Sequence, residues 1–166
     1  MPQQLDNLVF DRTQADVSRL KTLTQKLISG TATAGEKAEW LAGMKGAYNY
    51  ADLNRVGDAV DYLTETLADM GYSVTTVTKT NWVESDIPIQ TQMAQYLTNI
   101  HNLRNCLPYV APDAPNDMQK LTYTEANNIE EILYTLESVL LAMQENFLLR
   151  QANTLFMVAG GVFNNA

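Results

Sequence analysis

The sequence has few of the residues that most metal sites and nucleic-acid interfaces require. Its 166 residues include one cysteine and one histidine. An internal disulfide is therefore excluded, and too few soft ligands remain for a structural zinc site. Basic residues are also scarce, because 11 Lys and Arg stand against 19 Asp and Glu and give a formal net charge of −8. A surface with this excess of negative charge repels phosphates, so nucleic acid is not an expected partner.

Long hydrophobic runs are absent as well. The longest run, Leu155 to Phe163, spans nine residues and contains two glycines, whereas a helix needs about 20 apolar residues to cross a bilayer. We therefore predict no membrane span. The first ten residues lack the basic region and apolar run of a signal peptide. This predicts that the chain is made and folded in the cytoplasm.

Catalytic signatures are missing too. The sequence contains no Gly-x-Ser-x-Gly, no glycine-rich phosphate loop and no His-x-x-x-His. We expect His101 to be solvated or hydrogen-bonded, and Cys106 to be a small buried or half-buried thiol. The acid pair Glu130 and Glu131 flanks an apolar seam and is expected on a solvated face. The sequence therefore predicts no enzyme, no cofactor and no metal site.

Apolar residues at helical spacing are abundant, and 46% of the chain is hydrophobic. They predict five helices, over about 13–28, 34–47, 53–70, 87–107 and 123–150. The third is the clearest, because its apolar residues follow the 3-4 spacing of a bundle seam from Leu53 to Met70. Ser85 or Asp86 is expected to cap the fourth, with Pro88 in its first turn. Residues 73–86 are rich in Thr and Val, and predict an extended crossover with room for a short strand pair.

Four helix starts carry the same local signal, an oxygen-bearing cap followed three residues later by an acid. The pairs are Thr13 and Asp16, Thr33 and Glu36, Asn49 and Asp52, and Thr122 and Glu125. Gly30 and Gly71 stand where a glycine ends a helix in the left-handed conformation. These signals predict where the helices begin and where two of them stop.

The sequence also contains an internal repeat. Residues 48–70 align without a gap over residues 121–143, at an offset of 73 residues. Asn54 and Asn127 match in this alignment, and we expect each amide to tie the preceding loop to its helix. The alignment predicts an all-α bundle over residues 1–154, built from two similar helix pairs in pseudo-repeats of about 10–72 and 86–150.

Residues 155–166 form a separate apolar tail. Its two glycines are expected to break any helix, and so many apolar residues are costly to leave in water. The tail is expected either to fold back on the bundle or to dock on a partner, and docking is the preferred hypothesis. The candidate docking residues are Leu155, Phe156, Val158, Val162 and Phe163.

Two stretches of the chain resemble known phage proteins. Residues 38–72 are similar to the N-terminal helical modules of tail and baseplate proteins in phages and prophages of Gram-positive gut bacteria. The signature consists of an aromatic residue, Asn, Asp, Asn, Arg and a hydrophobic residue at the start of a helix that continues into a Tyr-Leu seam. Here these are Tyr48, Asn49, Asp52, Asn54, Arg55 and Val56, then Tyr62 and Leu63. Residues 85–108 and 121–133 resemble the same group.

The resemblance implies a structural role in the virion and no catalytic residues. We expect an adaptor between other tail proteins of a phage or a related injection apparatus, present in several symmetric copies. The alternative is a cytoplasmic assembly chaperone, or a small binding module encoded with phage structural genes.

Overall fold

The computed structural model describes the backbone of residues 4–162 and the side chains of residues 4–152. It contains five helices and, within those residues, no strand. The helices are α1 (Gln14–Ile28), α2 (Ala34–Leu41), α3 (Tyr50–Asp69), α4 (Gln90–Arg104) and α5 (Tyr123–Val162). The predicted all-α fold with five helices is confirmed. Residues 73–83 are neither helix nor strand, so the crossover is present without the strand pair.

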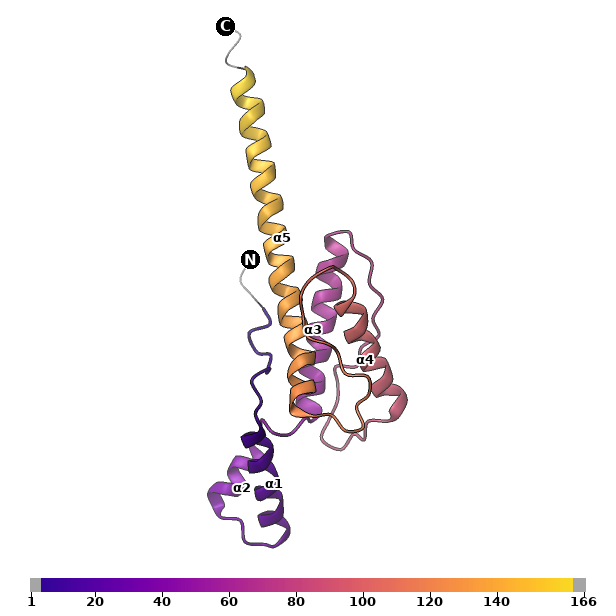
Figure 1. Cartoon of the computed structure of the whole chain (residues 1–166). Helices are drawn as coiled ribbons and strands as arrows, with labels where there is room; N and C mark the ends of the chain where they lie inside the picture. The colour runs from indigo at the N-terminus through magenta and orange to yellow at the C-terminus, as the bar shows by residue number, and fades with distance from the viewer. Residues whose placement is uncertain (1–3, 163–166) are drawn as a thin grey trace.

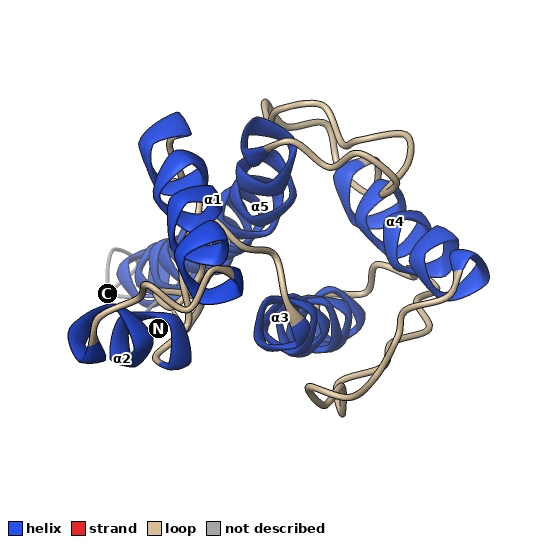
Figure 2. Cartoon of the chain, turned by 90° about the horizontal axis from the view of Figure 1, so that it is seen from below, coloured by secondary structure: helices blue, strands red, loops and turns tan. Residues whose placement is uncertain are grey.

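Three helices form a bundle, and the other two form a hairpin beside it. α3, α4 and α5 pack against one another, whereas α1 packs against α2 at one end of the bundle (Figures 1 and 2). This arrangement differs from the prediction of two similar helix pairs. The extended segment 4–12, and not α1, packs along α5. Its Leu5 and Leu8 are buried in the bundle core. α1 therefore buries only Leu23 completely.

Most of the bundle core consists of the apolar side chains that the 3-4 spacing predicts. Removing their surface from water supplies the main favourable term in folding. These residues are Val56, Val60, Leu63 and Leu67 from α3, Leu97, Ile100 and Leu103 from α4, and Ile129, Leu133, Leu136 and Leu140 from α5. Leu5, Leu8, Ala59 and Ile132 are buried in the same core. This core makes the bundle the rigid part from which the other elements project.

Most helix starts agree with the sequence prediction. The cap and acid pairs before α1, α2 and α3 each form a reciprocal capping box, and Thr122 and Glu125 form the same bonds before α5. Gly30 and Gly71 adopt φ of 70° and 86°, as expected of terminal glycines. The start of α4 differs, because its cap residue is Ile89. Asp86 instead accepts from Lys79 Nζ and from the Val83 amide.

Three helices differ in length from the prediction. α4 is shorter than the predicted 87–107 at both ends, and for α2 and α5 the difference involves glycine. α2 ends at Leu41 instead of residue 47, because Gly43 adopts a φ of 88° that a helix does not allow. α5 continues to Val162, through Gly160 and Gly161, so the predicted break there is wrong. Each helical glycine costs only about 1 kcal/mol relative to Ala. That cost does not end a helix that already contains about ten turns before Gly160.

The loop 42–49, which connects the hairpin to α3, lies against α1 at Gly46. A Cβ added at this position would lie 2.3 Å from the Asp16 carbonyl oxygen and 2.8 Å from the Val17 nitrogen, both in the first turn of α1. Only a residue without a side chain allows the backbone of the loop 42–49 to approach α1 this closely.

We expect Gly46→Ala to destabilise the protein by about 1–3 kcal/mol, because the added methyl group forces two backbone segments apart. Gly35→Ala is the matched control. It lies within α2 with no heavy atom within 4 Å of an added Cβ, so it should be neutral or stabilising. Denaturant unfolding monitored by circular dichroism measures both. Equal midpoints for the two variants would contradict the close approach at Gly46.

Candidate functional site

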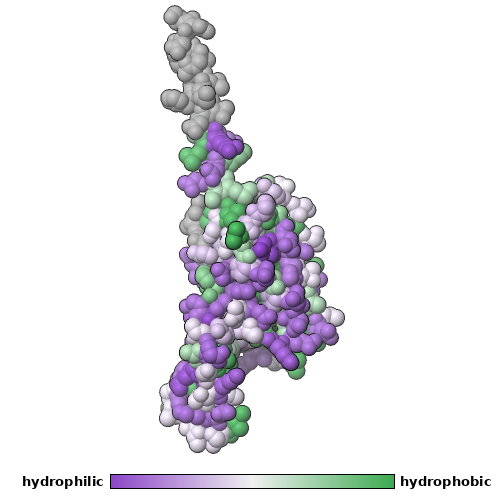
Figure 3. All heavy atoms as spheres, viewed as in Figure 1, coloured by the Kyte–Doolittle hydropathy of each residue, from purple (hydrophilic) through white to green (hydrophobic). Residues whose placement is uncertain are grey.

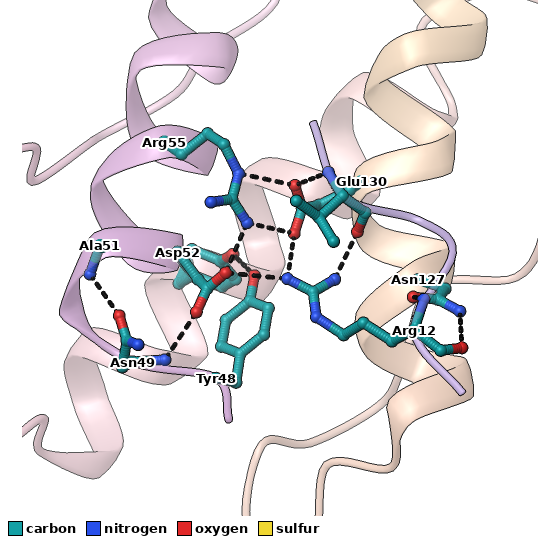
Figure 4. Close-up of polar contacts among 10 residues, drawn as sticks. Arg12, Tyr48, Asn49, Ala51, Asp52, Arg55, Asn127 and Glu130 are labelled. Atoms are coloured by element: carbon teal, nitrogen blue, oxygen red, sulfur yellow. Dashed lines mark hydrogen bonds and ion pairs between the residues drawn. The ribbon is translucent and has the colours of Figure 1, made fainter. Parts of the chain in front are cut away.

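The most unusual feature of the interior is a cluster of four charged side chains between α3 and α5 (Figure 4). Arg12, which precedes α1, places Nη2 2.8 Å from Asp52 Oδ1 and 2.7 Å from Glu130 Oε1. Arg55 donates to both oxygens of Glu130, at 2.9 Å from Nε and 2.8 Å from Nη2, and also pairs with Asp52. Two cations thus balance two anions in a charge-neutral group that we call the ionic cluster.

Glu130 lies at the centre of the ionic cluster and is completely buried. Besides the two arginines, the backbone N–H of Val9 donates to its Oε2 at 2.7 Å. The prediction that Glu130 lies on a solvated face is therefore wrong, whereas its neighbour Glu131 is exposed as expected. One residue along a helix turns the side chain by about 100°, so adjacent acids face opposite environments.

A pair of tyrosines flanks the ionic cluster. The Tyr48 and Tyr96 hydroxyl groups are hydrogen-bonded to each other, and the Tyr48 ring lies 5.2 Å from the Arg12 guanidinium carbon. Burial raises the pKa of both hydroxyl groups above the usual range, and the nearby Glu130 carboxylate acts in the same direction. Both phenols therefore stay protonated at physiological pH and hold α4 to the chain that enters α3.

Asparagine side chains hold the extended segments onto the helices. The Trp82 backbone N–H donates to Asn54 Oδ1 at 2.8 Å, and Asn54 Nδ2 donates to the Trp82 carbonyl at 2.9 Å. Asn127 makes the same two bonds with the backbone of Arg12, at 3.0 and 2.9 Å. The predicted structural role of both amides is confirmed. The segments they hold, however, are not the loops that directly precede their helices.

The contacts of α3 and α5 with these segments repeat at the offset of 73 residues found in the sequence. The contacting positions are Asn54, Gly57, Asp61 and Thr64 on α3, and Asn127, Glu130, Tyr134 and Glu137 on α5. Both segments run antiparallel to the helix that carries them. At this offset the two halves of the repeat are residues 1–73 and 74–146. Segment 4–12 belongs to the first half but lies on α5, and the crossover from residue 74 onward belongs to the second half but lies on α3. Each half therefore holds an extended segment of the other.

The remaining residues of interest are not brought together. His101 Nε2 lies 3.2 Å from the Pro115 carbonyl oxygen, and Cys106 is a half-buried free thiol whose pKa is raised by burial. Within the described part of the chain, no three His, Cys, Asp or Glu side chains are grouped so that they could hold a metal ion. Neither residue has the neighbours that nucleophilic or general base chemistry requires.

Apolar surface is instead exposed at the two ends of the molecule. α5 projects beyond the bundle, and where it leaves the bundle Phe147, Leu148 and Leu149 are 62%, 64% and 57% exposed (Figures 1 and 3). Four of the predicted docking residues, Leu155, Phe156, Val158 and Val162, belong to the outer turns of this helix, where only the backbone is described. Phe163 lies outside the described residues.

At the opposite end, a groove of about 530 Å³ lies between the hairpin and the bundle. Its lining includes the side chains of Trp40, Met44, Tyr50, Trp82 and Pro88, with Glu84 and Asp86 also present. Leu41 lines the same groove and is 84% exposed. Sequence reasoning missed this groove, because it forms only where the loop 42–49 and the end of the crossover meet.

Comparison of the chain with protein-family models, with curated proteins and with solved structures finds no match. Among the described residues, no helix combines the length and the apolar character that crossing a bilayer demands.

We expect Glu130→Gln to lower the free energy of unfolding by about 3–5 kcal/mol, because two arginines then lose their buried counter-charge. Glu131→Gln makes the same chemical change one residue away on the exposed face and should have almost no effect. Urea titration of both variants provides the measurement. Equal shifts of the two urea midpoints would show that the ionic cluster does not stabilise the fold.

Asn54→Ala should release the crossover from α3 and cost about 1–3 kcal/mol, because the buried N–H and carbonyl of Trp82 lose their partner. The local measurement is hydrogen exchange, in which the amide hydrogen of Trp82 should exchange much faster than in the wild-type chain. Asn146→Ala serves as control, since this exposed side chain only donates to the Ala142 carbonyl of its own helix. An unchanged exchange rate at Trp82 would show that the amide does not hold the segment.

Proposed function

We propose that this chain is a structural virion component of a phage tail or baseplate, or of a related injection apparatus, and that it acts as an adaptor between other tail proteins. The observation that carries the proposal is the presence of exposed apolar surface at two opposite ends of one rigid bundle. One end is the projecting part of α5, and the other is the groove beside the hairpin. An adaptor needs two such surfaces, because it must hold two neighbours at a set distance.

The interior supports the same role. The ionic cluster, the Asn127 clamp and the bundle core join segments that lie more than 100 residues apart in the chain, and the Asn54 clamp joins segments 28 residues apart. Such cross-linking resists local opening, so a load applied at one end is transmitted to the other through packed side chains. The acidic surface, with a net charge of −8, keeps the chain soluble and orients it relative to its neighbours, whereas apolar contacts provide most of the binding affinity.

The resemblance of residues 38–72 to phage tail and baseplate modules supports the assignment to a particle. The residues that carry this resemblance have structural positions. Asn49 caps α3, Asn54 clamps the crossover, and Asp52 and Arg55 belong to the ionic cluster. The residues of this signature therefore form the joint between α3, α5 and the two extended segments. The chain would be made in the host cytoplasm and then built into the virion.

The proposal is tested by mass spectrometry of purified particles from a host that carries the gene. We expect the chain at a fixed ratio to the other tail proteins, in several copies. A chain truncated after Thr154 should fold, because the bundle core ends before this residue, but should be missing from the particles. If the full-length chain is abundant in the lysate and absent from the finished particles, it acts as an assembly chaperone and the proposal is wrong.

A further inference from the structure

α5 carries two different apolar seams along its length. Inside the bundle, the buried seam runs through Leu133, Leu136 and Leu140 and reaches Met143. The same spacing continues to Phe147, which is 62% exposed, and would next require apolar residues at positions 150 and 154, where Arg150 and Thr154 stand. The bundle seam therefore ends one turn beyond the bundle, at Phe147.

A second seam with a different phase begins at Leu141, inside the bundle, and continues beyond it. Leucine or valine recurs every seven residues at Leu141, Leu148, Leu155 and Val162, and Ala152 and Ala159 fall four residues after the second and third of these. The backbone is helical throughout this stretch. A seven-residue spacing with apolar residues at alternating steps of four and three is the pattern of a helix that winds around another helix.

The second seam continues the face of α5 that holds segment 4–12 inside the bundle. Tyr134, seven residues before Leu141, packs against Phe10, and Glu137 accepts the backbone N–H groups of Gln4 and Leu5. The described part of the segment reaches no further along α5. Beyond it, Leu148 is 64% exposed, although the spacing of this face remains that of a packed helix.

We propose that a second copy of this chain covers the outer part of α5, so that the projecting helices of two or more copies form a coiled coil. Identical helices present the same seven-residue spacing, and their seams therefore match along the whole shared length. The alanines at the intermediate positions allow the helices to approach closely. Residues 151–162 contain no charged residue, so identical copies do not repel each other there.

The opposite side of the same helix differs in a way that supports this arrangement. Asn146, Arg150 and Asn153 recur at steps of four and three on the side away from the seam, and Asn146 and Arg150 are exposed. Over residues 146–153 the projecting helix thus has a polar side opposite the seam, whereas residues 155–162 are all apolar or glycine. A second copy of the chain would be what one end of the proposed adaptor binds. Only the purpose of this self-association in the particle rests on the proposed function.

The test compares Leu148→Glu with Asn146→Glu in the full-length chain. Both add one negative charge to the same exposed turn of α5, the first on the seam and the second on the polar side. Sedimentation velocity over a wide range of concentration should show self-association of the wild-type chain and of Asn146→Glu. Leu148→Glu should weaken association by about tenfold to a hundredfold, because one buried leucine per copy is lost. Circular dichroism checks that all three chains are equally folded.

A wild-type chain that remains monomeric at every concentration would overturn the proposal, and so would equal weakening by the two variants. A monomer that floats with phosphatidylcholine vesicles would assign the seam to a lipid surface instead, which also overturns it. These outcomes are independent of whether the chain is found in particles. Failure of self-association and failure of the adaptor proposal can therefore be told apart.

Discussion

The structure depends on one buried contact, the insertion of the Arg12 guanidinium between Asp52 and Glu130. This contact joins three parts of the chain, because Arg12 ends the first extended segment and the two acids belong to α3 and α5. It determines where segment 4–12 lies, and therefore from which point the α1/α2 hairpin leaves the bundle. A buried arginine is tolerated only with such partners, since an uncompensated charge in the interior costs several kcal/mol. The ionic cluster thus joins the segment that leads into the hairpin to the two helices of the bundle.

The exchange of extended segments between the two halves explains why the repeat is visible in sequence but does not produce two separate helix pairs. Asn54 and Asn127 perform the same task at equivalent positions, each holding a backbone that comes from the other half. Gly57 and Glu130 also occupy equivalent positions of the repeat, yet they contact the extended segments in different ways. Gly57 leaves room for Thr80, to which an added Cβ would approach within 2.9 Å, whereas Glu130 binds Arg12, Arg55 and the Val9 amide.

Local features of this fold could be predicted from the sequence, and features that depend on distant partners could not. The capping boxes at Thr13, Thr33 and Asn49 form because each involves only four consecutive residues. The burial of Glu130 escaped prediction because its partners lie 118 and 75 residues away. Glycine was ambiguous for a related reason. Gly43 ends α2, whereas Gly160 and Gly161 continue α5, and only the surrounding chain decides which occurs.

The proposed adaptor role places the binding surfaces at the two ends of the molecule, and a density map of the assembled particle tests it most directly. We expect symmetric copies of the bundle, with their α5 helices packed along the seam of Leu148 and Leu155 and with a different protein seated in the groove beside Trp40 and Tyr50. A map in which the chain is present but both of these surfaces face solvent would contradict the role of an adaptor.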